Sequence, residues 1–363
     1  MNRIATRSVF GIGLSLLIIA QALAQANFYG EQDFKRIEKI DAHVHLHGLA
    51  DQFMAQAITD HFRVLTINVD YPDFPPIDDQ LAAALSLRKR YPHQVAFAAT
   101  FSVENFASPD WAAQQVHSIQ SALAQGAVGV KLWKNIGMDL KDGDRYVMPD
   151  DPRFEPIFSA IEQAHSVLIG HQAEPLNCWL PFNEMTVLSD REYFAQHPQY
   201  YMHDHPERPL HEEILAARDR MLAAHPDLRF DAVHLASLEW DVKRIAQFLD
   251  RFPNAVVDMS ARTSHLERQA VKSPRRVRAF LIRYQDRILY GSDEEYGPAE
   301  GDPGAINSVH DAWFNDWLFL ATDRRLHSPE FPYAYRGMHL PKAVLDKIYR
   351  ANAEREFPNG WSQ

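Results

Sequence analysis

Short apolar segments alternate with segments of helical periodicity along most of the chain. Eight segments have the composition of buried strands: 37–43, 63–69, 95–101, 127–133, 167–171, 229–234, 255–259 and 287–291. Between them lie amphipathic helical patterns, with apolar positions such as Phe154, Ile157, Phe158, Ile161 and Leu210, Ile214, Ala217, Met221. Strands that each precede a helix predict an α/β fold with a parallel sheet. A single (β/α)8 TIM barrel is the commonest way to close that number of strands, and a doubly wound open sheet is the alternative.

Two connections are longer than the usual short loop, and they follow the fourth and fifth predicted strands. They span 133–152 and 172–209. Long loops in a compact domain are typical of lids and binding loops, and loops that follow barrel strands lie at the C-terminal face. The second loop is rich in aromatic residues, which indicates either a ring-bearing ligand or packing of the loop on the barrel: Trp179, Tyr193, Phe194, Tyr200 and Tyr201.

The first 24 residues differ from the rest. Arg3 and Arg7 precede an apolar run over 9–20, and the small residues Ala22 and Ala24 follow. This pattern predicts a secretory signal peptide over 1–24 and one barrel domain over 25–363, exported to the periplasm or secreted. The apolar run is too short to span a bilayer comfortably, so we expect no membrane attachment after cleavage.

Charge and cysteine content exclude several kinds of site. The chain has 37 Lys and Arg against 48 Asp and Glu, a formal net charge of −11, which disfavours nucleic acid as a partner. Cys178 is the single cysteine, so neither an internal disulfide nor a multi-thiolate metal site can form. We therefore expect a small-molecule substrate and any metal bound through nitrogen and oxygen atoms. The sequence leaves homo-oligomerisation open.

Histidine and aspartate residues recur where predicted strands end. His43 and His45 project to the same side of an extended chain, because side chains two residues apart share a face. His171, His234 and Asp293 follow three other strands. The C-terminal ends of barrel strands meet at one rim, so these side chains are predicted to converge on a divalent metal such as Zn²⁺. The alternative is a set of unrelated polar residues at the strand ends.

With these residues in place, the sequence resembles the amidohydrolase superfamily, specifically the amidohydrolase-related branch. That branch includes aminocarboxymuconate-semialdehyde decarboxylase, resorcylate decarboxylases and pyrone-dicarboxylate lactonase. The resemblance spans nearly the whole chain after the signal segment, and it rests on the motifs Ile40-Asp41-Ala42-His43-Val44-His45, Gly170-His171, Ala232-Val233-His234-Leu235, Tyr290-Gly291-Ser292-Asp293 and the closing helix over 348–353.

The resemblance implies a role for each of these side chains. It implies that His43, His45, His171 and Asp293 bind the metal. It also implies that His234 positions the substrate or transfers protons. Members with two metals use a carboxylated lysine on the fourth strand as a bridge, whereas this branch usually keeps one metal.

Lys131 is the candidate for that fourth-strand position. It shares a strand face with Ala127 and Gly129, and small residues on one face are typical of the crowded barrel interior, so we expect Lys131 to point inward. Three roles remain open: a carboxylated bridge between two metals, an unmodified cation facing the substrate, or a counter-charge to Asp293 or another acid at the rim. We expect one metal ion and an unmodified Lys131.

These features predict a metal-dependent hydrolase of a small cyclic ester, amide or lactone, acting through a metal-activated water. Asp293 would accept the proton of the water, and His234 would stabilise charge on the carbonyl oxygen. Arg262 either holds a substrate carboxylate or lies on the surface. The alternatives are a decarboxylase or hydratase that uses the same site, and a non-catalytic binding barrel.

Overall fold

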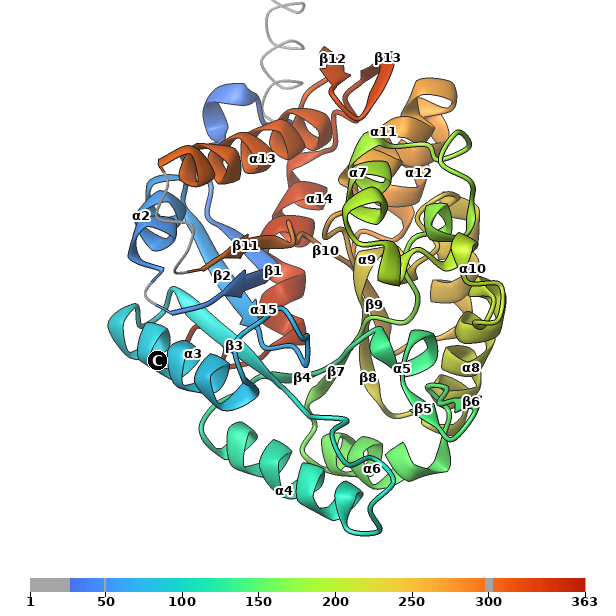
Figure 1. Ribbon diagram of the computed structural model, residues 1–363. Helices are drawn as coiled ribbons and strands as arrows, with labels where there is room; N and C mark the ends of the chain where they lie inside the picture. The colour runs from blue at the N-terminus through green and yellow to red at the C-terminus, as the bar shows by residue number, and fades with distance from the viewer. Residues whose placement is uncertain (1–26, 49, 298–302, 363) are drawn as a thin grey trace, which may run out of the picture.

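The computed structural model describes residues 27–48, 50–297 and 303–362, and the predicted signal peptide lies outside them. Its centre is a curled parallel sheet with the strand order β10-β9-β8-β7-β4-β3-β2-β1-β11 (Figure 1). The strands are β1 (Lys39–Leu46), β2 (Phe62–Ile67), β3 (Val95–Thr100), β4 (Gly129–Leu132), β7 (Val167–Gly170), β8 (Arg229–Ala232), β9 (Ala255–Asp258), β10 (Ile288–Leu289) and β11 (Glu294–Tyr296). All eight predicted strands are therefore confirmed.

The eighth barrel strand is interrupted and joins both edges of the sheet. β10 pairs with β9, and β11 pairs with β1. In the interruption, the Ala42 amide donates to the Tyr290 carbonyl at 2.9 Å, and the Asp293 amide donates to the His43 carbonyl at 2.9 Å. The sheet thus closes into the predicted TIM barrel, and the doubly wound open sheet is wrong.

Helices surround the barrel on its outer side (Figure 1). They are α2 (Asp51–Thr59), α3 (Ile77–Arg90), α4 (Trp111–Ala124), α6 (Glu155–Gln163), α8 (His211–Ala224), α10 (Val242–Arg251), α11 (Thr263–Lys272), α12 (Pro274–Arg283) and α13 (Pro303–Ala321). The two helical patterns in the sequence fall in α6 and α8, so both predictions are confirmed. Each helix buries one apolar stripe, as α10 does with Val242, Ile245, Phe248 and Leu249.

Both long loops occur where the sequence predicts them. The loop after β4 contains a small hairpin, β5 (Lys141–Asp142) and β6 (Arg145–Tyr146). The loop after β7 contains the helix α7 (Leu188–Gln196) and short 3-10 turns. The predicted closing helix is present as a π-helical turn (Lys347–Ala351) that continues into α15 (Asn352–Glu356).

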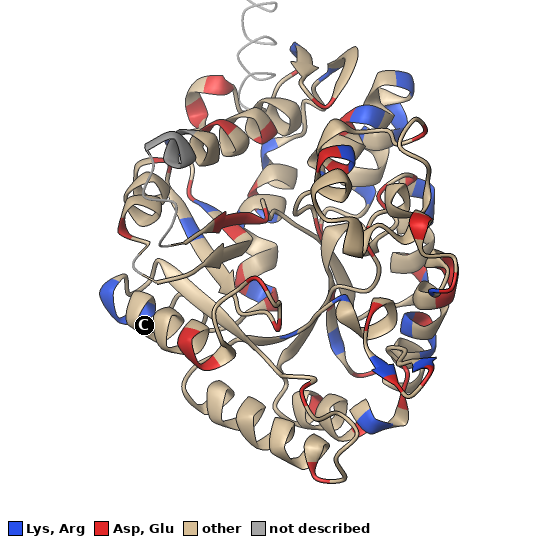
Figure 2. Ribbon diagram, in the orientation of Figure 1, with Lys and Arg blue, Asp and Glu red and all other residues tan. Residues whose placement is uncertain are grey.

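Two surface properties complete the description. Among the described residues, Lys, Arg, Asp and Glu occur mainly on the outer helices and loops, with both signs represented on α8 and α10 (Figure 2). Among the helices of the described segments, none is both long enough and apolar enough to cross a bilayer.

Candidate active site

A cavity of about 300 Å³ lies at the C-terminal ends of the barrel strands. Residues from several strands line it, among them His45, Lys131, His171, His234, Arg262 and Asp293. Tyr71, Phe74, Trp133 and Tyr193 supply aromatic lining. The side chains predicted at separate strand ends therefore share one cavity, and His43 lies fully buried beside them.

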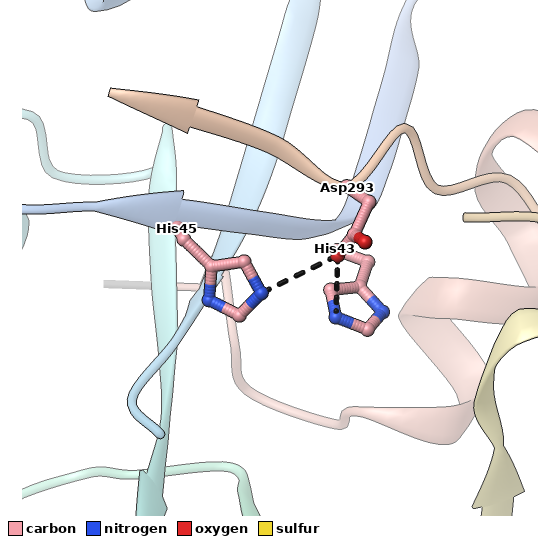
Figure 3. Close-up of side chains that lie close together, drawn as sticks. All are labelled: His43, His45 and Asp293. Carbon is pink, nitrogen blue, oxygen red and sulfur yellow. Dashed lines mark ion pairs between the residues drawn. The ribbon is translucent and has the colours of Figure 1, made fainter. Parts of the chain in front are cut away.

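Three of these residues form a group with the composition of a metal site. One ligand atom from each of His43, His45 and Asp293 lies within 4.8 Å of the others. Oδ1 of Asp293 lies 3.2 Å from Nε2 of His43 and 3.3 Å from Nε2 of His45. Figure 3 shows the rings of His43 and His45, both on β1, facing the carboxylate of Asp293, which lies in the segment that follows β10. Ligands bonded to a tetrahedral ion at about 2.0–2.2 Å stand about 3.3–3.6 Å apart, which is close to this spacing.

The hydrogen bonds on the far side of each ring determine which nitrogen carries the proton. Nδ1 of His45 lies 2.8 Å from the Ile67 carbonyl oxygen, which can only accept a hydrogen bond. Nδ1 of His43 lies 2.6 Å from Oδ2 of Asp258 and donates to it. Burial lowers the pKa of His43, and the Lys131 ammonium lowers it further, so this ring is neutral. In the neutral tautomer that donates from Nδ1, the Nε2 atom of each ring carries the lone pair that can bind a metal ion beside Asp293.

The Asp293 carboxylate is ionised at the point where these lone pairs meet. Burial opposes its ionisation, whereas positive charge on the neighbouring imidazoles of His234 and His43 lowers the pKa of Asp293 well below its usual range; where these rings are neutral, a bound cation would have to supply that charge. Two lone pairs and an anionic oxygen in contact repel one another unless a cation lies between them. The donor set of two imidazoles and one carboxylate suits Zn²⁺ and related divalent ions, so the residues fit a metal.

Asp258 organises this group, and our sequence analysis missed it. It is fully buried at the end of β9, where one oxygen receives the His43 ring N–H. Its other oxygen accepts the His234 amide at 2.6 Å and the Ser260 hydroxyl at 2.6 Å. Burial opposes ionisation, but the adjoining His43 ring and these hydrogen bonds hold the pKa of Asp258 below its ordinary value. An acid at the end of an otherwise apolar, buried strand is the sequence signal that could have identified it.

Asp41 holds in place the segment that interrupts the eighth barrel strand and contains Asp293. Its carboxylate accepts hydrogen bonds from the Ser292 amide at 3.0 Å and the Ser292 hydroxyl at 2.5 Å. Asp293 has a φ of 70°, a left-handed conformation that needs such support. A Cβ at Gly291 would lie 2.9 Å from Cβ of His43, so only glycine allows the two segments to approach this closely.

His171 lies in the same cavity but outside the three-residue group. Its ring centroid is 4.2 Å from that of His234, which in turn lies 5.1 Å from that of His43. Nε2 of His171 is buried and has no hydrogen-bond partner among the described residues. A buried imidazole nitrogen without a partner is typical of a position that receives a ligand. Its role as a further metal ligand stays a prediction.

His234 lies in a left-handed turn that follows β8. The φ angles of His234, Leu235, Ala236 and Ser237 are 58°, 57°, 61° and 50°. Each such residue costs about 1–2 kcal/mol relative to a right-handed conformation, and none of the four is glycine. Nδ1 of His234 donates to the Ser260 carbonyl at 3.0 Å, which leaves the Nε2 lone pair free to interact with a substrate. Burial lowers the pKa of His234 well below its ordinary value.

Lys131 points into the barrel, as its strand face predicts. Its side chain is 1% exposed, and Nζ lies 3.3 Å from Nε2 of His43. Burial lowers the pKa of Lys131 to about 8, although Asp293 and Asp258 oppose the shift. The amine is therefore close enough to the donor group to contact either a metal ligand or a bound substrate.

A second polar group lies beside His171 in the same cavity. Glu174 is buried, ion-pairs with Lys134, and lies 3.6 Å from Arg262 and 3.8 Å from His171. Arg262 is 7% exposed, so the surface role considered for it is wrong. Its Nε has no hydrogen-bond partner among the described residues. We call Glu174, Lys134 and Arg262 the Glu174 group; the sequence analysis identified only Arg262 as a candidate site residue.

Comparisons with known proteins agree with this architecture. The family described as Amidohydrolase matches residues 40–358. The chain therefore belongs to the amidohydrolase family. Comparison with curated proteins gives no match.

Three solved structures are among those to which the chain is similar. A 2,6-dihydroxybenzoate decarboxylase complexed with 2,6-dihydroxybenzoate is 17% identical, with 88% of this chain and 99% of that chain covered and a TM-score of 0.51. A dihydroxybenzoic acid decarboxylase from Polaromonas sp. JS666, with bound manganese and 2-nitroresorcinol, is 14% identical over 88% and 96%, with a TM-score of 0.49. A Pseudomonas putida protein assigned as a 2-pyrone-4,6-dicarboxylic acid hydrolase is 13% identical over 90% and 98%, with a TM-score of 0.47. At these identities, the similarity concerns the fold alone.

Proposed function

We propose that the protein is a metal-dependent hydrolase that acts on a small cyclic ester, amide or lactone. The observation that carries the proposal is the convergence of Nε2 of His43, Nε2 of His45 and the Asp293 carboxylate at one wall of the cavity. A divalent ion held by these residues would supply Lewis acidity, which polarises a carbonyl and lowers the pKa of water. Zn²⁺ is the ion we expect, and Mn²⁺ is the alternative that the same donors accommodate.

Three side chains of the chain itself would carry the remaining chemistry. The Asp293 carboxylate is ionised and faces the cavity, so it can accept the proton of an attacking water and return it to the leaving group. Nε2 of His234 can accept a hydrogen bond from the reacting group, because Nδ1 is committed to Ser260. Lys131 can place a positive charge beside the oxygen on which negative charge develops.

The cavity also defines the expected size and character of the substrate. A volume of about 300 Å³ admits a molecule of one or two rings, and Tyr71, Phe74 and Trp133 can pack against it. Arg262 is buried and its Nε has no hydrogen-bond partner in the described part of the chain, which suits a carboxylate on the substrate. We propose one metal ion per chain, with Lys131 unmodified.

Decarboxylation is the second candidate, favoured by the buried cations Arg262 and Lys131 beside aromatic lining, which suit an aromatic acid. The 2,6-dihydroxybenzoate decarboxylase with a similar fold acts on such a compound. Incubating purified, metal-analysed protein with panels of lactones, cyclic amides and aromatic acids distinguishes the two. Release of carbon dioxide without ring opening would replace the hydrolase proposal, and no turnover of any panel would favour a binding barrel.

Metal analysis of the same preparation tests the number of ions. One equivalent of metal per chain and an unmodified lysine mass for Lys131 are expected. Two equivalents, or a carbamate on Lys131 in a crystal structure, would contradict the one-metal proposal.

We further propose that the protein is exported to the periplasm or secreted, on the basis of the basic, apolar and small-residue pattern in residues 1–24. Mass spectrometry of protein expressed in a Gram-negative host should find a mature chain that begins near Gln25. A full-length cytosolic product would refute export.

A further inference from the structure

Arg218 connects an outer helix to the turn that carries His234. It lies on α8, is 2% exposed, and its NH1 donates to the Ala236 carbonyl at 2.6 Å. Its Nε and NH2 donate to Oδ1 of Asp219 at 3.1 Å and 2.9 Å. The guanidinium carbon lies 4.4 Å from the centre of the Phe248 ring. The guanidinium is therefore held on three sides and cannot adopt many other positions.

The left-handed turn needs a hydrogen-bond donor where Arg218 supplies one. The His234 carbonyl accepts from the Ser237 amide at 3.1 Å, and the Leu235 carbonyl accepts from the Leu238 amide at 3.1 Å. Among the described residues, no backbone amide donates to the next carbonyl, that of Ala236. Ala236 is 2% exposed, and a buried carbonyl without a partner is strongly disfavoured.

The turn is thus fastened at both ends. Asp258 accepts the His234 amide at the start of the turn, and Arg218 donates to Ala236 near its end. We propose that Arg218 is a positioning residue whose hydrogen bond to Ala236 maintains the left-handed turn and so holds the His234 ring against the cavity. The catalytic importance of this arrangement rests on the proposed role of His234, but its structural effect does not.

The surroundings of Arg218 allow an unusually specific test. Arg218 lines a groove of about 440 Å³ on the outside of the barrel, together with residues of α8 and α10 that include Arg251 and Phe248. Truncation of Arg218 to alanine would leave a hole that adjoins this groove. A guanidinium ion from solvent could enter the hole and replace the missing donor.

The experiment uses hydrogen exchange in the full chain, because this measurement needs no substrate. In Arg218→Ala, peptides that cover residues 234–238 should exchange about tenfold faster or more, as expected from the loss of a buried hydrogen bond. Peptides from β2 and β3 should keep their rates. Millimolar guanidinium chloride should restore the slow exchange, whereas the same concentration of sodium chloride should not.

Arg251→Ala is the matched control. Arg251 lies in the same groove and donates to the other oxygen of Asp219 at 2.8 Å, but among the described residues it makes no hydrogen bond to the turn over 234–238. Its removal should leave exchange of residues 234–238 unchanged. Should Arg218→Ala not fold, Arg218→Lys is measured instead; one donor in place of the fork should give a smaller acceleration confined to the same peptides.

Unchanged exchange at 234–238 in the folded Arg218 variant, or equal acceleration throughout the barrel, would overturn the proposal. Acceleration confined to the turn but not reversed by guanidinium would also overturn it, because the missing donor would then not be the cause. If the turn loosens as expected while turnover of an identified substrate is unaffected, the positioning of His234 stands and its proposed role in the reaction fails.

Discussion

The group formed by His43, His45 and Asp293 is held by strands, whereas the Glu174 group, beside His171 in the same cavity, is held by loops. In the first, each imidazole is oriented by an acceptor on another strand, Asp258 on β9 at 2.6 Å for His43 and Ile67 on β2 at 2.8 Å for His45. In the second, the buried Glu174 carboxylate is shared by the cations of Lys134 and Arg262, and Asp190 adds negative charge beside Arg262. The strand-held end of the site therefore depends mainly on the orientation of its side chains, and the loop-held end depends mainly on the balance of its charges. Substitutions in the strand-held end should therefore change metal binding and turnover, whereas substitutions in the loop-held end should change stability.

The largest effect is expected at the strand-held end. His43→Ala removes a donor atom and leaves Asp258 and Lys131 buried without their imidazole partner. Bound metal should be lost, and turnover should fall by about three orders of magnitude or more. Elemental analysis and steady-state kinetics measure the two outcomes. His47→Ala, which removes a buried imidazole outside the group, should keep its metal; a metal-replete, active His43→Ala protein would show that the metal site lies elsewhere.

The loop-held end should respond through stability. Glu174→Gln leaves Lys134 and Arg262 without their shared counter-charge, so the free energy of unfolding should fall by about 3 kcal/mol. Urea unfolding measures this change, and metal content should stay constant. Glu295→Gln is the control, because that carboxylate is 48% exposed and should change the stability by less than about 0.5 kcal/mol. Equal effects of the two substitutions would mean that charge balance does not govern this end.

A milder substitution sharpens the contrast within the strand-held end. Asp258→Asn weakens the hydrogen bond that orients His43, so metal affinity should fall by about 10–100-fold, as is typical for partners of metal-binding histidines. Competition with a chelator measures the affinity. Asp231→Asn provides the control, since Asp231 is also a fully buried acid but has no hydrogen-bond partner among the described residues. A similar loss of affinity in both variants would argue for a general effect of replacing a buried acid.

The smallest effect is expected from one hydroxyl at the loop-held end. The Tyr193 hydroxyl accepts a hydrogen bond from Nζ of Lys134 at 3.2 Å. Tyr193→Phe should lower the unfolding free energy by about 1 kcal/mol and raise KM by about fivefold, without loss of metal. Tyr201→Phe removes a hydroxyl that donates to the Leu180 carbonyl outside the cavity, so it should cost similar stability but leave KM unchanged. An altered KM in both variants would refute a specific role for Tyr193.

The same contrast explains which parts of the site could be predicted from the sequence. The two-residue alternation of a strand places His43 and His45 on one face, and the small neighbours of Lys131 place it inside the barrel. Both predictions use only the geometry of extended chains. The closing of the barrel follows equally from the regular alternation of strands and helices.

The features that were missed depend on contacts between distant segments. The turn at His234 contains no glycine or asparagine, so nothing in the local sequence indicates four left-handed residues; Asp258 and Arg218, which fasten it, come from other elements. Glu174 resembles any acid of a polar loop until the fold brings Arg262 against it. Burial and pairing of such charges emerge only in the tertiary structure.

The interrupted eighth strand has a consequence for the order in which the molecule can assemble. Asp41 and Ser292, whose hydrogen bonds fasten the closing seam, are 251 positions apart in the chain. Contacts of such high separation form late, after the intervening elements have collapsed. One edge of β1 therefore stays unpaired during synthesis until nearly all the other strands have been made. The two histidines of β1 come close to the Asp293 carboxylate only at that last step. A metal ion that binds all three residues therefore binds the closed barrel and stabilises the contact between β1 and the eighth strand.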